Sequence, residues 1–339
     1  MKTLTVGICS YQRRDSVLRL VRALDEQARE SPDAWRGVDV CVVLDGSDDG
    51  SREALDAYDA SFALKVIWQH NQGLATARNT VVEAATGEII WFLDDDLVPA
   101  AGTIDRHRQA HEGDEIGFML GPCLVPDDLD VTDDVREWWK NNYGVLEASG
   151  AVERLDQFGV ANASAPVAVV RAAGGFNERF RGYGWEDYEF GARVLALGHR
   201  ERYDPRAVSW HYTTVDESLS FERLRSEGHG VALTFQLHPE LAAGYFPTTY
   251  TRRLPRLLDR LHVYSPRVLW GIASLNHAIM GPAERLLRSH APRFRRVAWE
   301  TAFLAGIADM DRGLLIQALG RPSSSPVSSA APPAVLPAP

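Results

Sequence analysis

Three consecutive carboxylates, Asp94, Asp95 and Asp96, follow directly on the apolar run Ile89–Leu93. The run is rich in β-branched and aromatic residues, which predicts a buried strand. Adjacent acids repel one another, so three of them beside a core strand are costly unless a divalent cation or a hydroxylated, positively charged ligand compensates them. Carboxylate oxygens suit Mg²⁺ or Mn²⁺. The alternative is a solvated acidic turn, and the rest of the chain has to decide between the two.

A second acidic loop follows another predicted strand. Val38–Leu44 is apolar except for Asp39 and ends at Asp45, in a turn-rich loop whose Ser51 is placed to open a helix. Strands are also predicted over Leu4–Cys9 and Leu64–Trp68, and helices alternate with them. This alternation of apolar strands with helices predicts an α/β fold with a mostly parallel sheet covered on both faces. Ligands of such sheets bind at the carboxyl ends of the strands, so Asp45 and the three-carboxylate run are expected on one rim.

Two local features follow from the same residues. Apolar positions spaced as in a helix follow the first strand, with Asp15 or Ser16 as the predicted N-cap. Along an extended chain, successive side chains point in opposite directions, so Asp95 is expected to face away from Asp96.

Length, net charge and cysteine content limit the classes of protein to which this chain can belong. The chain has 339 residues and a formal net charge of −10, which argues against general nucleic-acid binding because that needs a basic field. Cys9, Cys41 and Cys123 are odd in number and widely spaced, which indicates reduced core residues and a cytoplasmic protein. No run of about 18 apolar residues occurs, so no membrane span is predicted.

Five motifs occur along the chain in one order. They are Val-Gly-Ile-Cys-Ser-Tyr-Gln-Arg at residues 6–13, Val-Val-Leu-Asp-Gly-Ser-Asp-Asp-Gly-Ser at 42–51, Asn-Gln-Gly-Leu-Ala-Thr-Ala-Arg-Asn at 71–79, Trp-Phe-Leu-Asp-Asp-Asp at 91–96 and Gly-Trp-Glu-Asp at 184–187. Together, over about residues 1–215, they resemble the family 2 glycosyltransferases of GT-A (Rossmann-like) fold. The resemblance implies an enzyme that binds a nucleotide-sugar (UDP-, dTDP- or GDP-sugar) and transfers the sugar to an acceptor hydroxyl, with inversion.

The same resemblance implies roles for single residues. Asp96 matches the metal ligand of the family's Asp-x-Asp (DXD) motif, for Mn²⁺ or Mg²⁺. The implied donor-binding set is Asp45 at the nucleobase, Asp94 near the ribose or sugar, Asp95 beside it, Ser10 and Arg13 in the nucleotide-contacting loop, and Arg78 and Asn79 at a helix start that faces the nucleotide. From the residues themselves, Trp185, Tyr183 and Tyr188 either form an aromatic platform for a sugar ring or pack the loop onto the sheet. A divalent ion makes chemical sense here because a departing diphosphate gathers negative charge.

The last motif offers a general base for the acceptor hydroxyl. Glu186 and Asp187 follow two glycines and precede a stretch with helical spacing, so they are expected at a helix N-terminus, where the dipole favours the ionised carboxylate. Taken alone the two acids indicate helix capping. Together with the other motifs, Asp187 is predicted to be the base and Glu186 an orienting or acceptor-binding residue. His211 follows a short strand-like run, where a single histidine is often packed or on the surface. The resemblance implies the alternative role of an additional metal ligand or a diphosphate contact.

The composition changes after about residue 215. Residues 251–296 hold ten arginines and no lysine, with helical apolar spacing. Such helices suit packing on the acidic domain, an oligomer contact, or peripheral docking on an anionic membrane surface. We therefore expect a catalytic domain over 1–215, a C-terminal helical extension over 216–320 and a disordered tail over 321–339.

The residues alone do not exclude several other functions. A nucleotide-sugar-binding protein or nucleotidyltransferase shares the parallel sheet and acidic rim, although the latter usually has a glycine-rich phosphate loop after its first strand, and residues 10–14 contain no glycine. A retaining transferase and a membrane-associated scaffold are further alternatives. The expected pathway is glycan or glycosylated natural-product biosynthesis.

Overall fold

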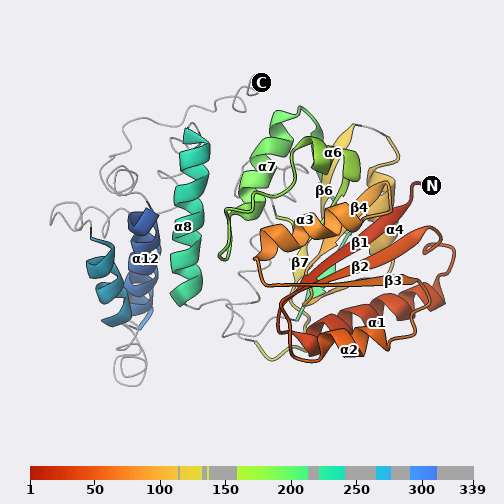
Figure 1. Cartoon of the computed structure of the whole chain (residues 1–339), viewed down its shortest axis with the longest axis horizontal. Helices are drawn as coiled ribbons and strands as arrows, with labels where there is room; N and C mark the ends of the chain where they lie inside the picture. Colours follow the sequence, from red (N-terminus) through yellow and green to blue (C-terminus); the bar gives the residue numbers. More distant parts are fainter. Residues whose placement is uncertain are drawn as a thin grey trace. The chain divides into compact units, whose positions relative to one another are not determined.

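The computed structural model describes residues 1–113, 115–131, 136, 159–212, 221–239, 241, 265–275 and 291–310. The described residues form two compact units (Figure 1). The first comprises residues 1–181 and 186–212, and the second comprises residues 182–185 together with the described residues from 221 onward. The predicted domain boundaries stay a prediction, and the expected tail over 321–339 lies outside the described residues.

The first unit is built on a seven-stranded sheet of order β3-β2-β1-β4-β8-β6-β9. The strands are β1 (Leu4–Ser10), β2 (Val38–Asp45), β3 (Ala63–Gln69), β4 (Ile89–Leu93), β6 (Ile116–Leu120), β8 (Asn162–Pro166) and β9 (Arg200–Tyr203). Strands β3, β2, β1 and β4 run parallel, whereas β8 runs antiparallel to both of its neighbours. The mostly parallel sheet predicted from the sequence is confirmed. Strands β1, β2 and β4 end together, which puts Ser10, Asp45 and the three-carboxylate run on one rim.

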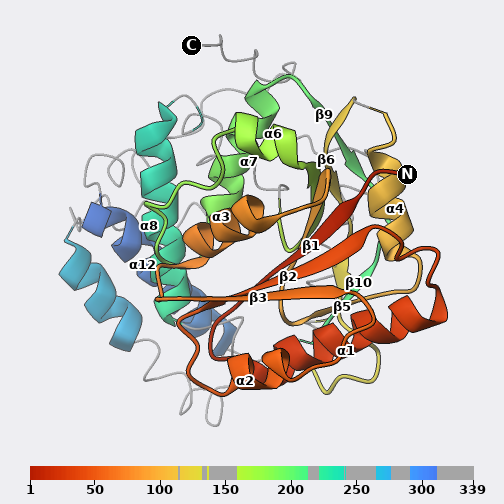
Figure 2. The same ribbon diagram turned by 45° about the vertical axis from the view of Figure 1, so that its right-hand side comes forward.

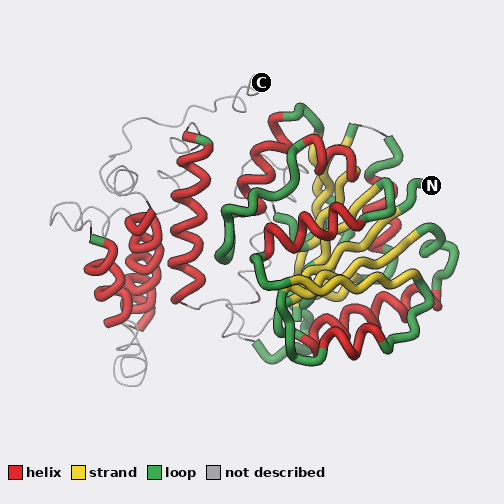
Figure 3. Tube along the Cα trace, in the orientation of Figure 1, coloured by secondary structure: helices red, strands yellow, loops and turns green. Residues whose placement is uncertain are grey.

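Helices cover both faces of this sheet (Figures 1 and 3). Helices α1 (Arg14–Glu30) and α2 (Ser51–Asp56) pack on one face, and α3 (Leu74–Ala84), α6 (Val167–Ala172) and α7 (Glu186–Ala196) on the other. Alternate residues of each central strand contribute to the two cores: Val40 and Val42 contact the α1 side, while Cys41 and Val43 contact the α3 side. Burial on both faces explains why these strands are mostly apolar.

A second sheet of three short strands lies beside the carboxylate rim. Strand β10 (Ser209–His211) pairs antiparallel with β5 (Leu97–Pro99) and parallel with β7 (Cys123–Leu124). Figure 2 shows β5 and β10 close to α1, where Gln27 Nε2 donates to the carbonyl of Pro99 at 2.7 Å. This sheet brings His211 next to the residues that follow β4. Helix α4 (Thr103–Ala110) connects β5 to β6.

One local expectation, the N-cap of the first helix, is wrong. Helix α1 begins at Arg14, and neither Asp15 nor Ser16 caps it. The carboxylate of Asp49, which follows β2, instead accepts a hydrogen bond from the Arg14 amide at 2.8 Å and another from the Ser51 amide at 3.1 Å. One acid from a different loop therefore serves the starts of both α1 and α2, which helical periodicity cannot reveal. Strand β3 is an edge strand, and its residues alternate in exposure.

The second unit contains two helices that pack closely, α8 (Phe221–Leu237) and α12 (Ala291–Met310). Gly228 and Gly306 face each other at the crossing, where a Cβ on Gly228 would lie 2.2 Å from the carbonyl oxygen of Phe303. Residues 266–275 are also helical, and most of the predicted arginine-rich segment lies outside the described residues. None of the helices in the described ranges has the length and apolar content needed to cross a membrane.

Candidate active site

The three-carboxylate run forms a tight turn between β4 and β5. The amide of Leu97 donates to the carbonyl of Asp94 at 3.1 Å, and the amide of Asp94 donates to the carbonyl of Ala161 at 2.9 Å. Because the chain turns here, the expectation that Asp95 and Asp96 face opposite ways is wrong. Both carboxylates contact the same guanidinium nitrogen, Arg13 Nη1.

Asp96 is held by two cationic or potentially cationic side chains. Its Oδ2 lies 2.9 Å from Arg13 Nη1 and 3.2 Å from His211 Nε2. Burial alone would raise the pKa of Asp96, but the hydrogen bond from His211 and the charges of His211 and Arg13 outweigh it and lower the pKa to about 2. The main chain is fixed as well, since the Tyr212 amide donates to the carbonyl of Asp96 at 2.9 Å. Asp96 is therefore an ionised, well-positioned carboxylate.

Asp95 lies deeper than its neighbour. Ser10 Oγ donates to its Oδ2 at 2.6 Å, and Arg13 Nη1 lies 3.2 Å from its Oδ1. Burial and the adjacent charge of Asp96 raise the pKa of Asp95 to about 7, against the opposing effect of Arg13 and Ser10. In this structure the predicted donor-binding residues Ser10 and Arg13 are thus partners of the carboxylates.

The donor set formed by Asp96 and His211 fits a divalent cation. A carboxylate oxygen and an imidazole nitrogen converge within 3.2 Å, and both atom types are ligands of Mn²⁺ and related ions. Within the described part of the chain, no cluster of three or more His, Cys, Asp or Glu side chains offers a complete metal site. Two protein ligands suit an ion that takes its remaining ligands from phosphate oxygens.

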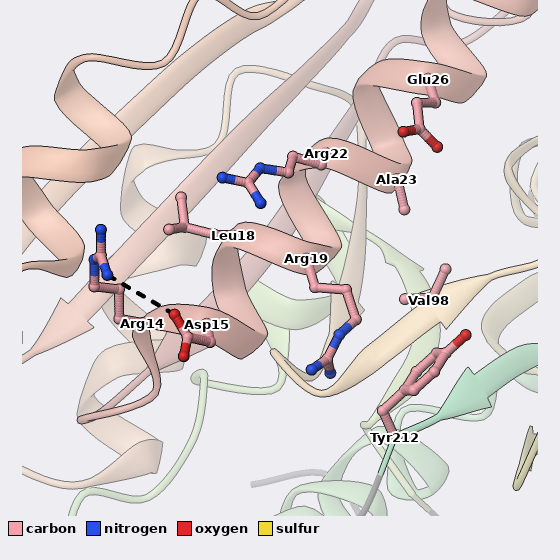
Figure 4. Close-up of a pocket in the computed structure, with 9 residues that line it drawn as sticks. All are labelled: Arg14, Asp15, Leu18, Arg19, Arg22, Ala23, Glu26, Val98 and Tyr212. Atoms are coloured by element: carbon pink, nitrogen blue, oxygen red, sulfur yellow. Dashed lines mark ion pairs between the residues drawn. The ribbon is translucent and has the colours of Figure 1, made fainter. Parts of the chain in front are cut away.

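Two hollows meet beside this cluster. One, of about 400 Å³, is lined by Gln12, Arg13, Arg14, Asp15, Ser16, Asp49, Asp96 and Tyr212. The other, of about 570 Å³, runs along the outer face of α1 and shares Arg14, Asp15 and Tyr212 with the first. Figure 4 shows Arg19 extending toward Tyr212 from that helix while Arg22 points to the other side, and the Arg19 guanidinium lies 5.0 Å from the centre of the Tyr212 ring. The smaller hollow is the one that reaches Asp96.

Asp45 occupies the end of β2 and closes the loop before α3. Its Oδ1 accepts hydrogen bonds from Gln69 Nε2 at 2.7 Å and the Gln72 amide at 3.0 Å, and its Oδ2 accepts one from the Gly73 amide at 2.9 Å. Gly73 has a φ of 94°, a conformation that glycine adopts without strain. Asp45 therefore organises the start of α3 at the rim, and Gln69 and Gln72 are site neighbours that the sequence reasoning missed.

Arg78 connects the carboxylate run to the start of α7. Its Nη1 lies 2.8 Å from Glu186 Oε1 and its Nη2 lies 3.3 Å from Asp94 Oδ1. Burial alone would lower the pKa of Arg78, but Glu186, Asp94 and Asp187 outweigh it, so the guanidinium stays charged. The predicted partner Asn79 engages the chain itself: its side chain donates to the Phe176 carbonyl at 2.9 Å and accepts from the Phe176 amide at 2.7 Å.

The chain enters α7 through a left-handed turn. Gly184 and Trp185 have φ values of 87° and 77°, and a positive φ at tryptophan is strained. This turn brings Glu186 and Asp187 to the first residues of the helix, as predicted. Burial and the neighbouring Glu186 raise the pKa of Asp187 well above the ordinary carboxylate range, with Arg78 opposing the rise. The expectation that the helix terminus keeps Asp187 readily ionised is therefore wrong, because burial outweighs the helix amides.

Trp185 is only 4% exposed, and its ring packs against Phe235 of α8, with centroids 5.8 Å apart at 73°. Tyr183 is 48% exposed, with the Arg223 guanidinium 3.8 Å from its ring centre. The burial of Trp185 favours the packing alternative for this residue, whereas Tyr183 is exposed.

A buried polar cluster supports the rim from behind, and no sequence motif pointed to it. Asn162 Oδ1 accepts hydrogen bonds from Trp91 and pairs with His107 Nε2, each at 3.0 Å, while its amide donates to the carbonyl of Ala207 at 2.8 Å. His107 and His111 both contact Ser164 Oγ at 2.9 Å. Polar residues in otherwise apolar segments were the only signal available.

Comparison with known proteins agrees with this geometry. Residues 5–156 match the model of glycosyl transferase family 2. The chain carries a family 2 glycosyltransferase domain. The family 2 domain holds four of the five sequence motifs, and its sheet has the GT-A architecture of the structural neighbours.

Curated relatives of the family 2 domain are glycosyltransferases. The validoxylamine A glucosyltransferase of Streptomyces hygroscopicus subsp. jinggangensis is 27% identical over 222 residues, which cover 58% of this chain and 52% of that protein. The pre-mycofactocin glycosyltransferase of Mycobacterium tuberculosis (strain H37Rv) is 26% identical over 202 residues, or 52% of this chain and 38% of that protein. The chain spans about half or less of the length of these relatives.

Solved structures share the fold. A mannosyltransferase from Pyrobaculum calidifontis, in complex with GDP-Man and Mn²⁺, aligns with a TM-score of 0.59 at 19% identity, covering 91% of this chain and 86% of that one. TarS of S. aureus in complex with UDP aligns with a TM-score of 0.53 at 16% identity, covering 90% of each chain. At these identities the likeness establishes the fold of the family 2 domain.

Proposed function

We propose that this protein transfers a sugar from a nucleoside-diphosphate-sugar to an acceptor hydroxyl, with inversion at the anomeric carbon and with the help of Mn²⁺ or Mg²⁺. The observation that carries the proposal is the arrangement of two carboxylate clusters on one rim. Asp96 and His211 form a cation-binding pair beside the smaller hollow, and Arg78 links Asp94 to Glu186 at the start of α7. One cluster suits a diphosphate with its metal, and the other suits an acceptor.

In this proposal Asp187 is the general base. The acceptor oxygen forms a bond to the anomeric carbon while the bond from that carbon to the diphosphate breaks, and Asp187 takes the hydroxyl proton. A carboxylate with a raised pKa is a stronger base near neutral pH, which favours the transfer once it is ionised. Glu186 Oε2 is buried and has no hydrogen-bond partner among the described residues, so it can accept a bond from an acceptor hydroxyl.

The remaining predicted residues serve the donor. Asp96 and His211 would hold the divalent ion, which supplies charge stabilisation to the leaving diphosphate. Arg13 and Ser10 lie at the mouth of the same site, while Asp45, Arg78 and Asn79 fix the loops that surround it. The complexes of the structural neighbours with GDP-Man and Mn²⁺ and with UDP support a nucleotide-sugar donor, without selecting its base or sugar.

A panel of UDP-, dTDP- and GDP-sugars, each with and without Mn²⁺, tests the proposal. We expect one donor to raise the melting temperature only when Mn²⁺ is present, because ligand that binds the native state stabilises it by about 2.7 kcal/mol at a hundredfold excess over Kd. The matched variant Asp96→Ala should fold and should lose this stabilisation. Absence of a shift with every donor, or an equal shift for Asp96→Ala, would contradict the assignment.

A further inference from the structure

Arg13 contacts the oxygen atom that is best placed to bind a divalent cation. Asp96 Oδ2 lies 2.9 Å from Arg13 Nη1 and 3.2 Å from His211 Nε2, and the same guanidinium nitrogen reaches Asp95 Oδ1 at 3.2 Å. The carboxylates of Asp95 and Asp96 are 7% and 13% exposed, so they need a nearby positive charge. Arg13 supplies that charge.

A guanidinium and a divalent cation compete for this position. Both would share the carboxylate of Asp96 in a partly buried site, where like charges repel more strongly than in water. An ion that binds Asp96 and His211 must therefore displace the Arg13 side chain or accept a strong repulsion. The Tyr212 amide holds the main chain of Asp96, and of the two side chains that of Arg13 is the more exposed, at 30% against 13%, so we expect the arginine to move.

The side chain of Arg13 has space into which it can move. Its side chain is 30% exposed and lines the 400 Å³ hollow that also reaches Asp96. A planar guanidinium binds phosphate oxygens through paired hydrogen bonds, and a diphosphate in this hollow would offer them. Arg14, which also lines the hollow, lies 3.9 Å from the exposed carboxylate of Asp15.

We propose that Arg13 is the resident counter-cation of Asp95 and Asp96 and that it transfers to the diphosphate when the divalent ion binds. Cation and nucleotide then bind as a pair, and each is bound weakly alone. The inference rests on the proposed function, since it assumes that Asp96 and His211 hold the ion. It adds that the coupling between cation binding and nucleotide binding depends on one arginine.

The test uses Mn²⁺ and nucleoside diphosphates, without turnover. Calorimetry measures the affinity of the full chain for Mn²⁺ alone, for UDP or GDP alone, and for each in the presence of the other. Wild type should bind Mn²⁺ weakly and bind it at least about tenfold more tightly with the diphosphate, and by linkage the reverse coupling must be equal. Arg13→Gln should bind Mn²⁺ alone about tenfold more tightly than wild type, because a charge-assisted competitor is gone. Its coupling to the diphosphate should shrink.

Arg14→Gln is the matched control, because it removes one positive charge from the same hollow without touching Asp95 or Asp96. If Arg13→Gln and Arg14→Gln change the Mn²⁺ affinity equally, long-range charge explains the effect and the inference is wrong. If Arg13→Gln fails to fold, the wild-type measurements still test the inference. Equal Mn²⁺ affinity of the wild type with and without diphosphate would contradict it. Loss of Mn²⁺ binding in every state would instead contradict the proposed metal site itself.

Discussion

Arg13 and Arg78 each join two carboxylates on the rim of the same sheet, but they differ in access to solvent. The side chain of Arg13 is 30% exposed and lines a hollow, whereas that of Arg78 is 5% exposed and pairs with the equally buried Glu186. A partly exposed guanidinium can exchange its partners for a ligand, while a pair buried on both sides is costly to break. The rim therefore combines a cluster that can respond to ligand with one that keeps the acids of α7 in place.

The largest expected effect is on stability at Arg78. Arg78→Met leaves the buried carboxylate of Glu186 without its partner, so the free energy of unfolding should fall by about 3–5 kcal/mol. Arg13→Gln should lower it by less, because Asp95 and Asp96 keep their contacts with Ser10 and His211 and the side chain of Arg13 is itself 30% exposed. Urea unfolding of both variants measures the difference. Adding Glu186→Gln to Arg78→Met should recover part of the loss, and equal losses for the two single variants would remove the contrast between the clusters.

A smaller effect is expected in the neutral cluster behind the rim. Burial lowers the pKa of His111 to about 4 and that of His107 to about 3, so both are neutral in the folded protein. A histidine with a lowered folded pKa stabilises the protein above the pKa of the unfolded chain and loses that contribution as pH falls. For one histidine the loss between pH 6.5 and 5.5 is about 1 kcal/mol.

The measurement compares wild type with His111→Gln at both pH values. Asp95 and Asp187, with raised pKa values, change stability in the opposite direction, so only the difference between the two proteins isolates the histidine. The penalty of His111→Gln should shrink by about 1 kcal/mol at pH 5.5. An unchanged penalty would mean that His111 carries a proton in the folded state.

The features that the sequence predicted correctly are those that depend on residues close together in the chain. Strand β4 and the carboxylates that follow it are contiguous, and the apolar pattern of β1, β2 and β4 defines the sheet and its rim. The start of α7 at Glu186 was also predicted, from glycines followed by helical spacing. These features are set by local preference and periodicity.

Partnerships between distant residues were not predictable in this way. Arg78 and Glu186 are 108 positions apart, so Arg78 was assigned to the nucleotide when the fold gives it a buried carboxylate partner. Asp49 caps α1 from a loop 35 positions away, and burial raises the pKa of Asp187 against the helix dipole. Each of these depends on how the sheet brings loops together and how deeply they are buried. A single sequence does not contain that information.

The most direct test of the account is the Asp187→Asn variant, with kcat at saturating donor measured beside donor and Mn²⁺ affinity by calorimetry. Asparagine keeps the size of the side chain but cannot accept the proton, so kcat should fall by about 10² or more while both affinities stay nearly unchanged. In wild type, kcat should be lost as pH falls through the raised pKa of Asp187, at a higher pH than for an ordinary carboxylate. Near-normal kcat in Asp187→Asn, or a loss of donor affinity instead, would contradict the account.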